Sequence, residues 1–488
     1  MEYNLVDYNK KLIQEEIGWA YRNLKWLTGK EAKLANRKRD ALLKSLFNEV
    51  NYSFARHKVH IGKLSPGCVI CGEGYWSCLF INKLCTANCF YCPQDRKIKK
   101  EDFSKEGMGR FIIRSPKDYA TYLKRFNFKG VGISGGECLL VFKKLLSYIK
   151  EIRKNFGKEI YIWIYTNGSL INEDKLRKLK EAGLNEIRFN ISARNYDLRP
   201  VELAVNIIDT VSVEIPAIPE DYKIVEKCLP KMQKIGVKYL NLHQLFATEF
   251  NYKNFVKRTY TFLHNHPFPI FESEITALKL MRYAIYNRIG LPINYCSGAY
   301  KNMFQSRGVR RWAALLVKED FEEITDIKFI RRLSIQDSPP NIKKIIRNLQ
   351  SNKCRHNLWL LSDTQKEIFI HSSLLKYINF KKYNLTITYF NILPQTFLRP
   401  DEVGKAIELN SHNKVFIKRE FQGQFKLLHP TTVKSFQKLF IENMREKEVL
   451  EDFCKNYGLT LNEWRKETKL LLTIKIFEYG EEGFPYIY

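Results

Sequence analysis

Three cysteines in one short loop constrain this chain more than any other feature. Cys85, Cys89 and Cys92 are separated by three and then two residues in the segment Cys-Thr-Ala-Asn-Cys-Phe-Tyr-Cys-Pro. Thiolates this close together are the soft ligands that iron–sulfur clusters prefer, and a cubane cluster held by three of them keeps one iron without a protein ligand. The loop therefore predicts a [4Fe-4S] cluster with one iron open to another molecule.

The same loop resembles the signature of the radical S-adenosylmethionine (radical SAM) enzymes, because aromatic Tyr91 directly precedes the third cysteine. The resemblance implies that the amino and carboxylate groups of S-adenosylmethionine (SAM) chelate the open iron, with Tyr91 placing the adenine through its backbone. It further implies that reductive cleavage yields a 5′-deoxyadenosyl radical, which abstracts hydrogen from a substrate. An electron donor such as flavodoxin or ferredoxin is then required.

A structural zinc site is the alternative, because cysteine pairs also bind zinc. A zinc ribbon needs a second tight pair, and the segments after Cys92 contain none. If the cysteines were only structural, the chain would be a non-catalytic, zinc-containing nucleic-acid-binding adaptor.

A second motif follows the next predicted strand, where Gly135 and Gly136 precede Glu137. Adjacent glycines allow a close backbone approach, and a carboxylate beside them can pair with a cation. The tripeptide resembles the motif with which radical SAM enzymes hold the methionyl ammonium of SAM. Its position after the cysteine loop strengthens the resemblance to this family.

Strands and helices alternate between about residues 75 and 245. The strands are predicted at 75–82, 130–134, 159–165, 186–192, 211–218 and 237–242. Repeated strand–helix units favour a parallel sheet with right-handed crossovers, whose functional groups gather at the carboxyl ends of the strands. The pattern fits the α/β class and the partial (β/α)6 parallel barrel of the radical SAM family.

Two short segments within this region, Thr166-Asn-Gly168 and Ile215-Pro-Ala-Ile-Pro219, most resemble the branch that includes pyruvate formate-lyase activating enzyme. The chain departs from that compact enzyme in its extra upstream cysteines and its long C-terminal extension. Polar residues at predicted strand ends are candidates for binding the ribose or carboxylate of SAM, with strand-end capping as the alternative: Asn167, Asn190, Ser192 and Arg194. His243 follows the last strand and is a candidate for facing the substrate.

Cysteines outside the loop suggest a second metal site. Cys68 and Cys71 form a Cys-x-x-Cys pair beside turn-forming glycines, which let backbone amides point at thiolate sulfur. Cys78 and Cys296 could complete an auxiliary iron–sulfur cluster or a zinc site. The alternative is that Cys78 is a buried strand residue and Cys296 a small buried side chain.

Length and patterning divide the 488 residues into three parts. Residues 1–62 are predicted to be a helical N-terminal segment, and 63–300 the radical SAM core with its cysteine-rich entry. Residues 301–488 are predicted to be a C-terminal α+β domain of unknown role, with a helix at 400–409. No apolar run is long enough to cross a bilayer and no signal peptide begins the chain, so we expect a cytoplasmic protein without membrane contact.

The substrate is not determined by these motifs. A peptide or protein substrate fits a long C-terminal region that recognises it. The net charge of +29 favours RNA instead, because basic surfaces gather phosphates, although lysine-rich composition alone would also produce this charge.

Overall fold

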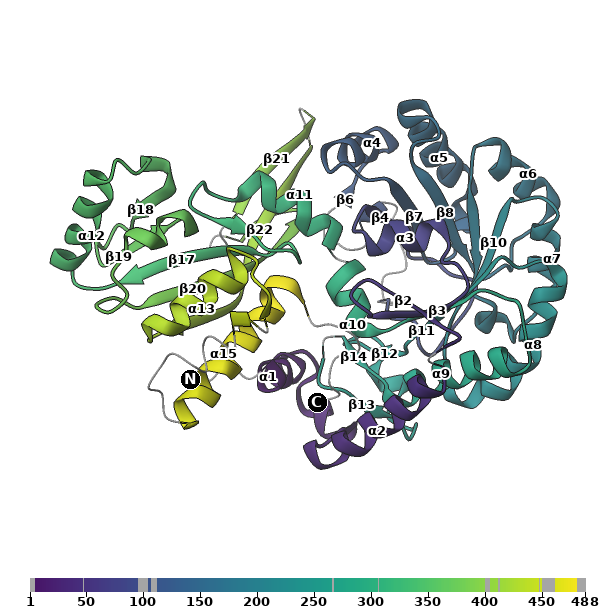
Figure 1. The fold of residues 1–488 in the computed structure, drawn as a ribbon. Coiled ribbons are helices and arrows are strands. Elements are labelled where there is room, and N and C mark those ends of the chain that lie inside the picture. Colours follow the sequence, from purple (N-terminus) through teal and green to yellow (C-terminus); the bar gives the residue numbers. More distant parts are fainter. Residues whose placement is uncertain are drawn as a thin grey trace. The chain divides into compact units, whose positions relative to one another are not determined.

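The computed structural model describes residues 5–46, 48–94, 104–106, 112–265, 267–305, 307–399, 404–410, 413–446, 448–449 and 461–480. The chain separates into two compact units (Figure 1). Of the described residues, one unit comprises those from 5 to 308 with 409, 410 and 413, and the other comprises those from 309 to 408 and from 414 to 480. The boundaries that we drew at residues 62 and 300 stay predictions.

A curved sheet of parallel strands forms the centre of the first unit. Its strands lie side by side in chain order: β4 (Trp76–Asn82), β7 (Gly130–Gly135), β8 (Tyr161–Thr166), β9 (Glu186–Phe189), β10 (Thr210–Pro216), β11 (Tyr239–His243) and β15 (Ile293–Cys296). The predicted α/β class and parallel partial barrel are confirmed. The sheet also contains a seventh parallel strand that we did not predict. This strand is β15, which pairs with β11.

Short antiparallel strands extend both edges of this sheet. β3 (Lys58–Ile61) pairs with β15 and with β2 (Asn51–Ser53), while β5 (Ser104–Glu106) pairs with β4 and with β6 (Ile112–Ile113). Residues 51–53 and 58–61 therefore form strands within the segment that we predicted to be helical. The reason is tertiary, because these strands are too short to show a convincing period and are stabilised by pairing with β15.

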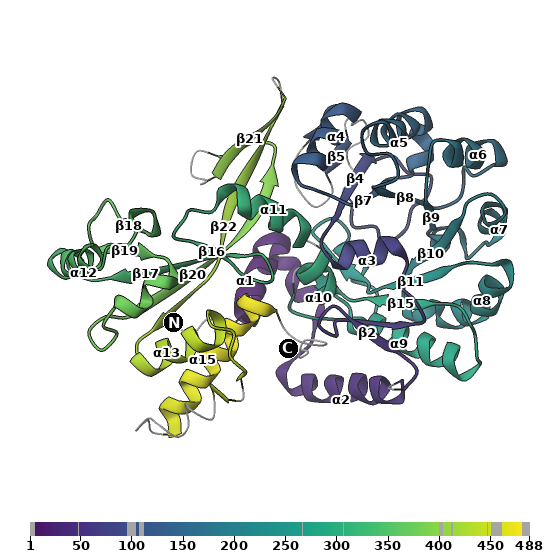
Figure 2. The ribbon, with the colours of Figure 1, turned by 45° about the horizontal axis from the view of Figure 1, so that its top comes forward.

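Helices cover the convex face of the sheet, and Figures 1 and 2 show them along its outer side. They are α4 (Pro116–Arg125), α5 (Phe142–Phe156), α6 (Glu173–Glu181), α7 (Arg199–Val205), α8 (Tyr222–Ile235) and α9 (Phe271–Tyr286). Side-chain caps start several of them: Ser115 caps α4 and Asn172 caps α6, each accepting a hydrogen bond from a backbone N–H of the first turn. Two shorter helices, α3 (Pro66–Gly72) and α10 (Gly298–Tyr300), lie on the concave side.

The strands alternate between an apolar face toward the outer helices and a polar face toward α3. In β10, Val211, Val213 and Ile215 are fully buried, whereas Ser212 and Glu214 point to the opposite face. A Cβ placed on Gly67 of α3 would meet the side chains of β9 and β8 on that polar face, so α3 lies directly against it. The sequence of the strands thus creates a polar concave surface.

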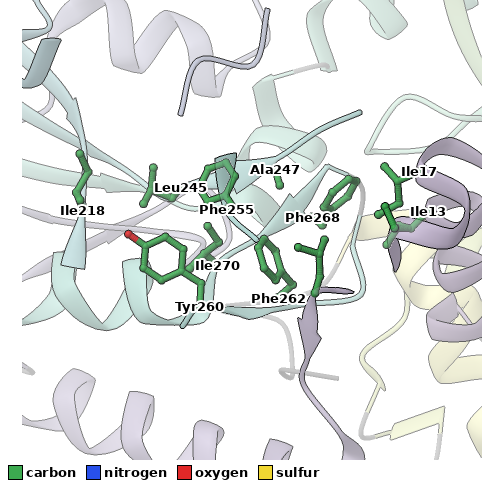
Figure 3. Packing of buried hydrophobic residues seen from close by; sticks show 12 residues of the cluster. Ile13, Ile17, Ile218, Leu245, Ala247, Phe255, Tyr260, Phe262, Phe268 and Ile270 are labelled. Carbon is green, nitrogen blue, oxygen red and sulfur yellow. The ribbon is translucent and has the colours of Figure 1, made fainter. Parts of the chain in front are cut away.

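An N-terminal layer supports the region that follows the barrel. It contains α1 (Leu5–Ile17), a 3-10 helix (Gly18–Asn23), β1 (Lys25–Trp26) and α2 (Gly29–Ser45). Figure 3 shows the core where α1 meets β12 (Phe246–Ala247), β13 (Thr261–Phe262) and β14 (Phe268–Pro269). The buried members are Ile13, Ile17, Ala20, Leu24, Ile218, Leu245, Ala247, Phe255, Tyr260, Phe262, Phe268 and Ile270, and Phe90 and Tyr91 of the cysteine loop pack against them.

The second unit is built on an antiparallel sheet with the order β18-β19-β17-β20-β22-β21 and with β16 beside β17. The strands are β16 (Glu323–Ile324), β17 (Ile330–Gln336), β18 (Trp359–Leu361), β19 (Glu367–Ile370), β20 (Leu385–Gln395), β21 (Gly404–Asn410) and β22 (Asn413–Leu427); the helices are α11 (Arg307–Val317), α12 (Pro339–Ser351), α13 (Pro430–Phe440) and α15 (Leu461–Tyr479). The predicted helix at 400–409 is wrong, because 404–410 pairs with the long strand β22.

None of the helices among the described residues combines the length and the apolar character needed to cross a bilayer.

Replacing Phe255 with alanine tests whether the core in Figure 3 holds the first unit together. Phe255 is fully buried, and its ring centroid lies 5.6 Å from that of Phe90 in the cysteine loop. We expect Phe255→Ala to lower the free energy of unfolding by about 3–5 kcal/mol in urea titrations. Phe250→Ala, on the same segment but 52% exposed, is the matched control and should change it by about 0.5 kcal/mol at most. Equal effects of the two variants would contradict this role of the core.

Candidate functional site

The cysteine loop leaves the carboxyl end of β4 and turns back on itself. The thiol of Cys85 is exposed, whereas Cys89 and Cys92 are partly buried, and none of the three forms a disulfide. The backbone N–H of Cys92 donates to the carbonyl of Cys89 at 3.2 Å, and the N–H of Ala87 points at Cys85 Sγ at 3.4 Å. The three thiols therefore come from one compact turn in which a backbone amide already faces a sulfur.

The segment after the barrel holds this loop in place. The side-chain amide of Asn251 donates to the carbonyl of Tyr91 at 3.0 Å, and that of Asn254 donates to the carbonyl of Phe90 at 2.8 Å. The guanidinium of Arg258 lies 3.7 Å from the centre of the Phe90 ring, at cation–π distance. These contacts fix the backbone between the second and third cysteines.

The paired glycines after β7 bring that strand end against the start of the loop. A Cβ on Gly135 would overlap the carbonyl of Asn82, and one on Gly136 would overlap the carbonyl of Leu84. Gly135 also has a φ of +117°, which side chains with a Cβ rarely adopt. Because Gly136 N–H donates to Asn82 and the amide of Gln94 donates to Gly135, the glycine turn is bonded to both ends of the loop.

Glu137 is buried beneath this turn and binds the end of the next strand. Its carboxylate accepts hydrogen bonds from Thr166 Oγ1 at 2.8 Å, from the N–H of Asn167 at 2.8 Å and from the N–H of Leu139 at 3.1 Å. Burial raises the pKa of Glu137, although the two backbone donors oppose this. Glu137 thus links β7 to β8, and its contact with the methionyl ammonium stays a prediction.

The polar residues predicted at strand ends form two groups around the loop. The Asn167 side chain donates to Thr86 Oγ1 at 2.9 Å and lies 3.7 Å from Cys85 Sγ. The Tyr91 hydroxyl is 2.6 Å from Ser192 Oγ and donates to Asn190 Oδ1 at 3.3 Å. The structure therefore brings together Tyr91, Asn190 and Ser192, and places Asn167 against the first cysteine.

Arg194 lies apart from these contacts. Its guanidinium is 3.9 Å from the carboxylate of Asp197, on a side chain that is about one-third exposed. Its role in binding SAM stays a prediction.

The residues of the loop fit a thiolate-ligated cluster by donor chemistry and by the glycine cradle. They supply three soft ligands in one turn, next to a glycine turn that packs against the backbone of Asn82 and Leu84 without room for a Cβ. Within the described residues, no group of three or more histidine, cysteine, aspartate or glutamate side chains is already arranged around a metal position. Assembly of a cluster would therefore draw the thiols of the loop together.

The concave face carries a network of charges that the sequence analysis missed. Arg188 Nε and Nη1 donate at 2.9 Å to Glu186 and Glu214, and both carboxylates are largely buried. Asn241 donates to Glu214 at 2.9 Å, and His243 Nε2 lies 2.5 Å from the other oxygen of the same carboxylate. Charged residues at alternate positions of otherwise apolar strands were the signal that could have revealed this face.

The pKa values of both Glu214 and His243 are lowered in this network. Burial alone would raise the pKa of Glu214, but His243, Arg188 and the hydrogen bond from Asn241 lower it well below its usual range. Burial, together with the charge of Lys301, lowers the pKa of His243 despite the nearby carboxylate. His243 is therefore a hydrogen-bonded member of the network, and contact with a substrate stays a prediction.

Three of the four cysteines predicted to form an auxiliary site line one small cavity on this face. Cys68, Cys71 and Cys296 border a space of about 20 Å³, together with Lys58 and Tyr300. Cys78 instead packs with Trp76 and Trp163. The cysteine pattern predicts a shared auxiliary site for Cys68, Cys71, Cys78 and Cys296, and nothing in the sequence around Lys58 places its side chain there.

The chain is similar in sequence to a known family and to proteins of known sequence. The chain matches the family model for the radical SAM superfamily over residues 79–238. A Methanocaldococcus jannaschii protein, provisionally named glycyl-radical enzyme activating enzyme MJ0021, is 30% identical over 354 residues, which cover 70% of this chain and 91% of the relative. Another protein of that organism, provisionally named GTP 3′,8-cyclase, is 32% identical over 120 residues, covering 24% of this chain and 36% of the relative.

Similarity to solved structures is weaker. The Streptococcus suis protein SuiB, bound to its precursor peptide SuiA, is 13% identical, with 60% of this chain and 61% of that chain covered and a TM-score of 0.35. A similarity of this size carries no argument about function.

Gly136→Ala tests the close approach of the glycine turn to the cysteine loop. The added methyl group would overlap the carbonyl of Leu84, so the loop must move. We expect a loss of most of the iron bound after anaerobic reconstitution, measured as iron per chain. Gly290→Ala is the control, because its Cβ would meet only the flexible side chain of Gln233. Unchanged iron content in Gly136→Ala would contradict this role of the turn.

Glu214→Gln tests the charge network through its pH dependence. The folded state lowers the pKa of Glu214 below the usual 4.5, so the carboxylate stabilises the fold above that pH and its contribution is lost as the pH falls. We expect the variant to lose about 3 kcal/mol at pH 7, and the difference from wild type to narrow below pH 4.5 in denaturant titrations. The exposed Glu173→Gln serves as control; a pH-independent difference for Glu214→Gln would count against the network.

Proposed function

Because this chain belongs to the radical SAM superfamily, we propose that it cleaves SAM reductively at a [4Fe-4S] cluster held by Cys85, Cys89 and Cys92. The observation that carries the proposal is the three-thiol turn seated against Gly135 and Gly136. When bound, the cluster and SAM supply a 5′-deoxyadenosyl radical that abstracts hydrogen from the substrate. The chain is an enzyme of this class, so a purely structural zinc adaptor is not retained as a hypothesis.

The chain's own residues would position the cofactor and keep the loop rigid. The three cysteines are the ligands, and the exposed thiol of Cys85 lies 3.7 Å from the side-chain amide nitrogen of Asn167. The glycine turn lets the end of β7 pack directly against the backbone of Asn82 and Leu84, which fixes where the cysteine loop begins. Tyr91, Asn190 and Ser192 form one hydrogen-bonded group on the other side, suited to the polar groups of a nucleoside.

We further propose a peptide or protein substrate. Support comes from the relative whose name assigns it to the glycyl-radical enzyme activating enzymes, since this chain covers 91% of its length. That resemblance agrees with the branch indicated by Thr166-Asn-Gly168 and Ile215–Pro219. Modification of RNA is the alternative that the net charge of +29 favours.

The proposed reaction also requires an electron donor and a reducing environment. Reductive cleavage needs a one-electron donor, for which we propose a flavodoxin or ferredoxin. Free thiols and an oxygen-sensitive cluster suit the reducing cytoplasm. An auxiliary iron–sulfur cluster or zinc ion at Cys68, Cys71, Cys78 and Cys296 also stays a proposal.

Replacing Cys85, Cys89 and Cys92 together with alanine tests the function directly. We expect the cluster absorbance and the formation of 5′-deoxyadenosine from SAM with dithionite to fall to background, because no thiolate of the loop remains. The control is Cys228→Ala, a buried cysteine of α8 outside the loop. Product formation that persists in the triple variant would reject the proposed cluster.

The substrate class has its own test. After the enzyme is incubated with SAM and dithionite, candidate proteins are examined for glycyl or other carbon-centred radicals by electron paramagnetic resonance. Salt-sensitive binding of RNA, without a radical on any protein, would favour the alternative.

A further inference from the structure

Three thiols and one ammonium group meet on the concave face of the sheet, outside the SAM site. Cys68 and Cys71 come from α3, Cys296 ends β15, and Lys58 begins β3. Lys58 is 1% exposed, Cys68 4% and Cys296 7%. Segments far apart in the chain thus place these groups around the same cavity of about 20 Å³.

Each of the three thiols has a hydrogen-bond donor of its own. Lys58 Nζ donates to Cys296 Sγ at 3.0 Å, and the hydroxyl of Tyr300 donates to Cys71 Sγ at 3.8 Å. The side-chain amide of Asn294 donates to Cys68 Sγ at 3.7 Å. Donors aimed at every sulfur are what metal-bound thiolates require, because these contacts orient the ligands and spread their charge. Buried thiols that only fill space need no such partners.

The buried charge of Lys58 also favours anionic thiolates at this site. A buried ammonium needs a nearby anion, yet no carboxylate in the described part of the chain forms an ion pair with it. The groups in contact with it that can become anionic are the thiols, and the face of the Tyr300 ring lies 4.0 Å from its Nζ. Lys301 and His243 also line the cavity. A divalent ion with three thiolate ligands carries one net negative charge, which one ammonium balances.

We propose that Cys68, Cys71 and Cys296 bind a single soft divalent metal ion, Zn²⁺ or Fe²⁺, with Lys58 as the neighbouring counter-charge. This narrows the predicted auxiliary site to three of its four cysteines, because Cys78 does not line the cavity. A cavity of about 20 Å³ accommodates one ion, whereas a four-iron core needs more space than this. The site does not depend on cleavage of SAM.

Metal binding would require a small rearrangement. As described, the thiols are not yet arranged around a common point, and the ammonium of Lys58 stands beside them. The metal would draw the three thiolates together, while Lys58 keeps its hydrogen bond to Cys296. Three protein ligands leave the fourth tetrahedral position for a water molecule or a substrate atom, as in zinc sites that take part in reactions.

The test uses the full chain with Cys85, Cys89 and Cys92 replaced by alanine, so that only the proposed site and scattered cysteines remain. The metal-free protein is titrated with Co²⁺ under anaerobic, reducing conditions. We expect one equivalent to bind with thiolate-to-cobalt charge-transfer absorption and tetrahedral d–d bands, and Zn²⁺ to displace it. If the chain with Cys85, Cys89 and Cys92 replaced by alanine develops no such spectrum, the proposal is overturned.

Single substitutions in this background identify the ligands. Cys68→Ser, Cys71→Ser and Cys296→Ser should each weaken Co²⁺ binding by more than about 100-fold, and Lys58→Met by about 10–100-fold. Cys78→Ser and Cys228→Ser are the matched controls and should leave the spectrum unchanged. Circular dichroism checks the folding of each variant. If Cys68→Ser or Cys296→Ser does not fold, Co²⁺ binding by the half-buried Cys71→Ser variant tests the proposed ligand set.

Two results would overturn the assignment even if metal binds. Unaltered Co²⁺ binding in Cys71→Ser or Cys296→Ser would show that other thiols are the ligands. Reconstitution of the same background with iron and sulfide to about four irons per chain, lost on Cys68→Ser, would show a cluster in place of a single ion. Both results are independent of 5′-deoxyadenosine formation, so failure here leaves the proposed function intact.

Discussion

The close approach of the glycine turn after β7 to the backbone that leaves β4 is the contact on which the site depends. Any side chain at Gly136 would overlap the carbonyl of Leu84. The ends of β4 and β7 can therefore approach this closely only because residue 136 is a glycine. Hydrogen bonds from Gly136 to Asn82 and from Glu137 to Leu84 then fix where the cysteine loop begins. This short backbone contact therefore sets the position of the three thiols and of any cluster that they bind.

Burial of Glu137 extends the same contact to the next strand. A carboxylate enclosed beneath the turn must find donors, and it finds them at Thr166 and Asn167 of the β8 end. Asn167 in turn reaches Cys85 and Thr86 through its side chain. The ends of β4, β7 and β8 are therefore joined by a chain of satisfied polar groups, which lets one rigid edge support a loop without secondary structure of its own.

The concave face follows a second constraint, that buried charges must be paired. Arg188 satisfies two carboxylates, and Glu214 joins strands β9, β10 and β11 through its partners. This network fills the space in front of α3 and leaves only a small cavity there. Lys58 differs from Arg188 because its neighbours are thiols, and that difference separates the proposed metal site from the rest of the face.

The sequence alone determined the local chemistry: the cysteine spacing, the paired glycines and the order of six parallel strands all follow from residue type and period, because ligand geometry, glycine conformation and strand alternation act over a few residues. It could not place β15, Lys58 or Glu214, whose neighbours are distant in the chain. Only the tertiary structure decided that α3 lies against the polar face and that β3 pairs with β15. The physical reason is that burial and charge pairing depend on which strands meet, and a strand of four residues carries too little pattern to reveal its partner.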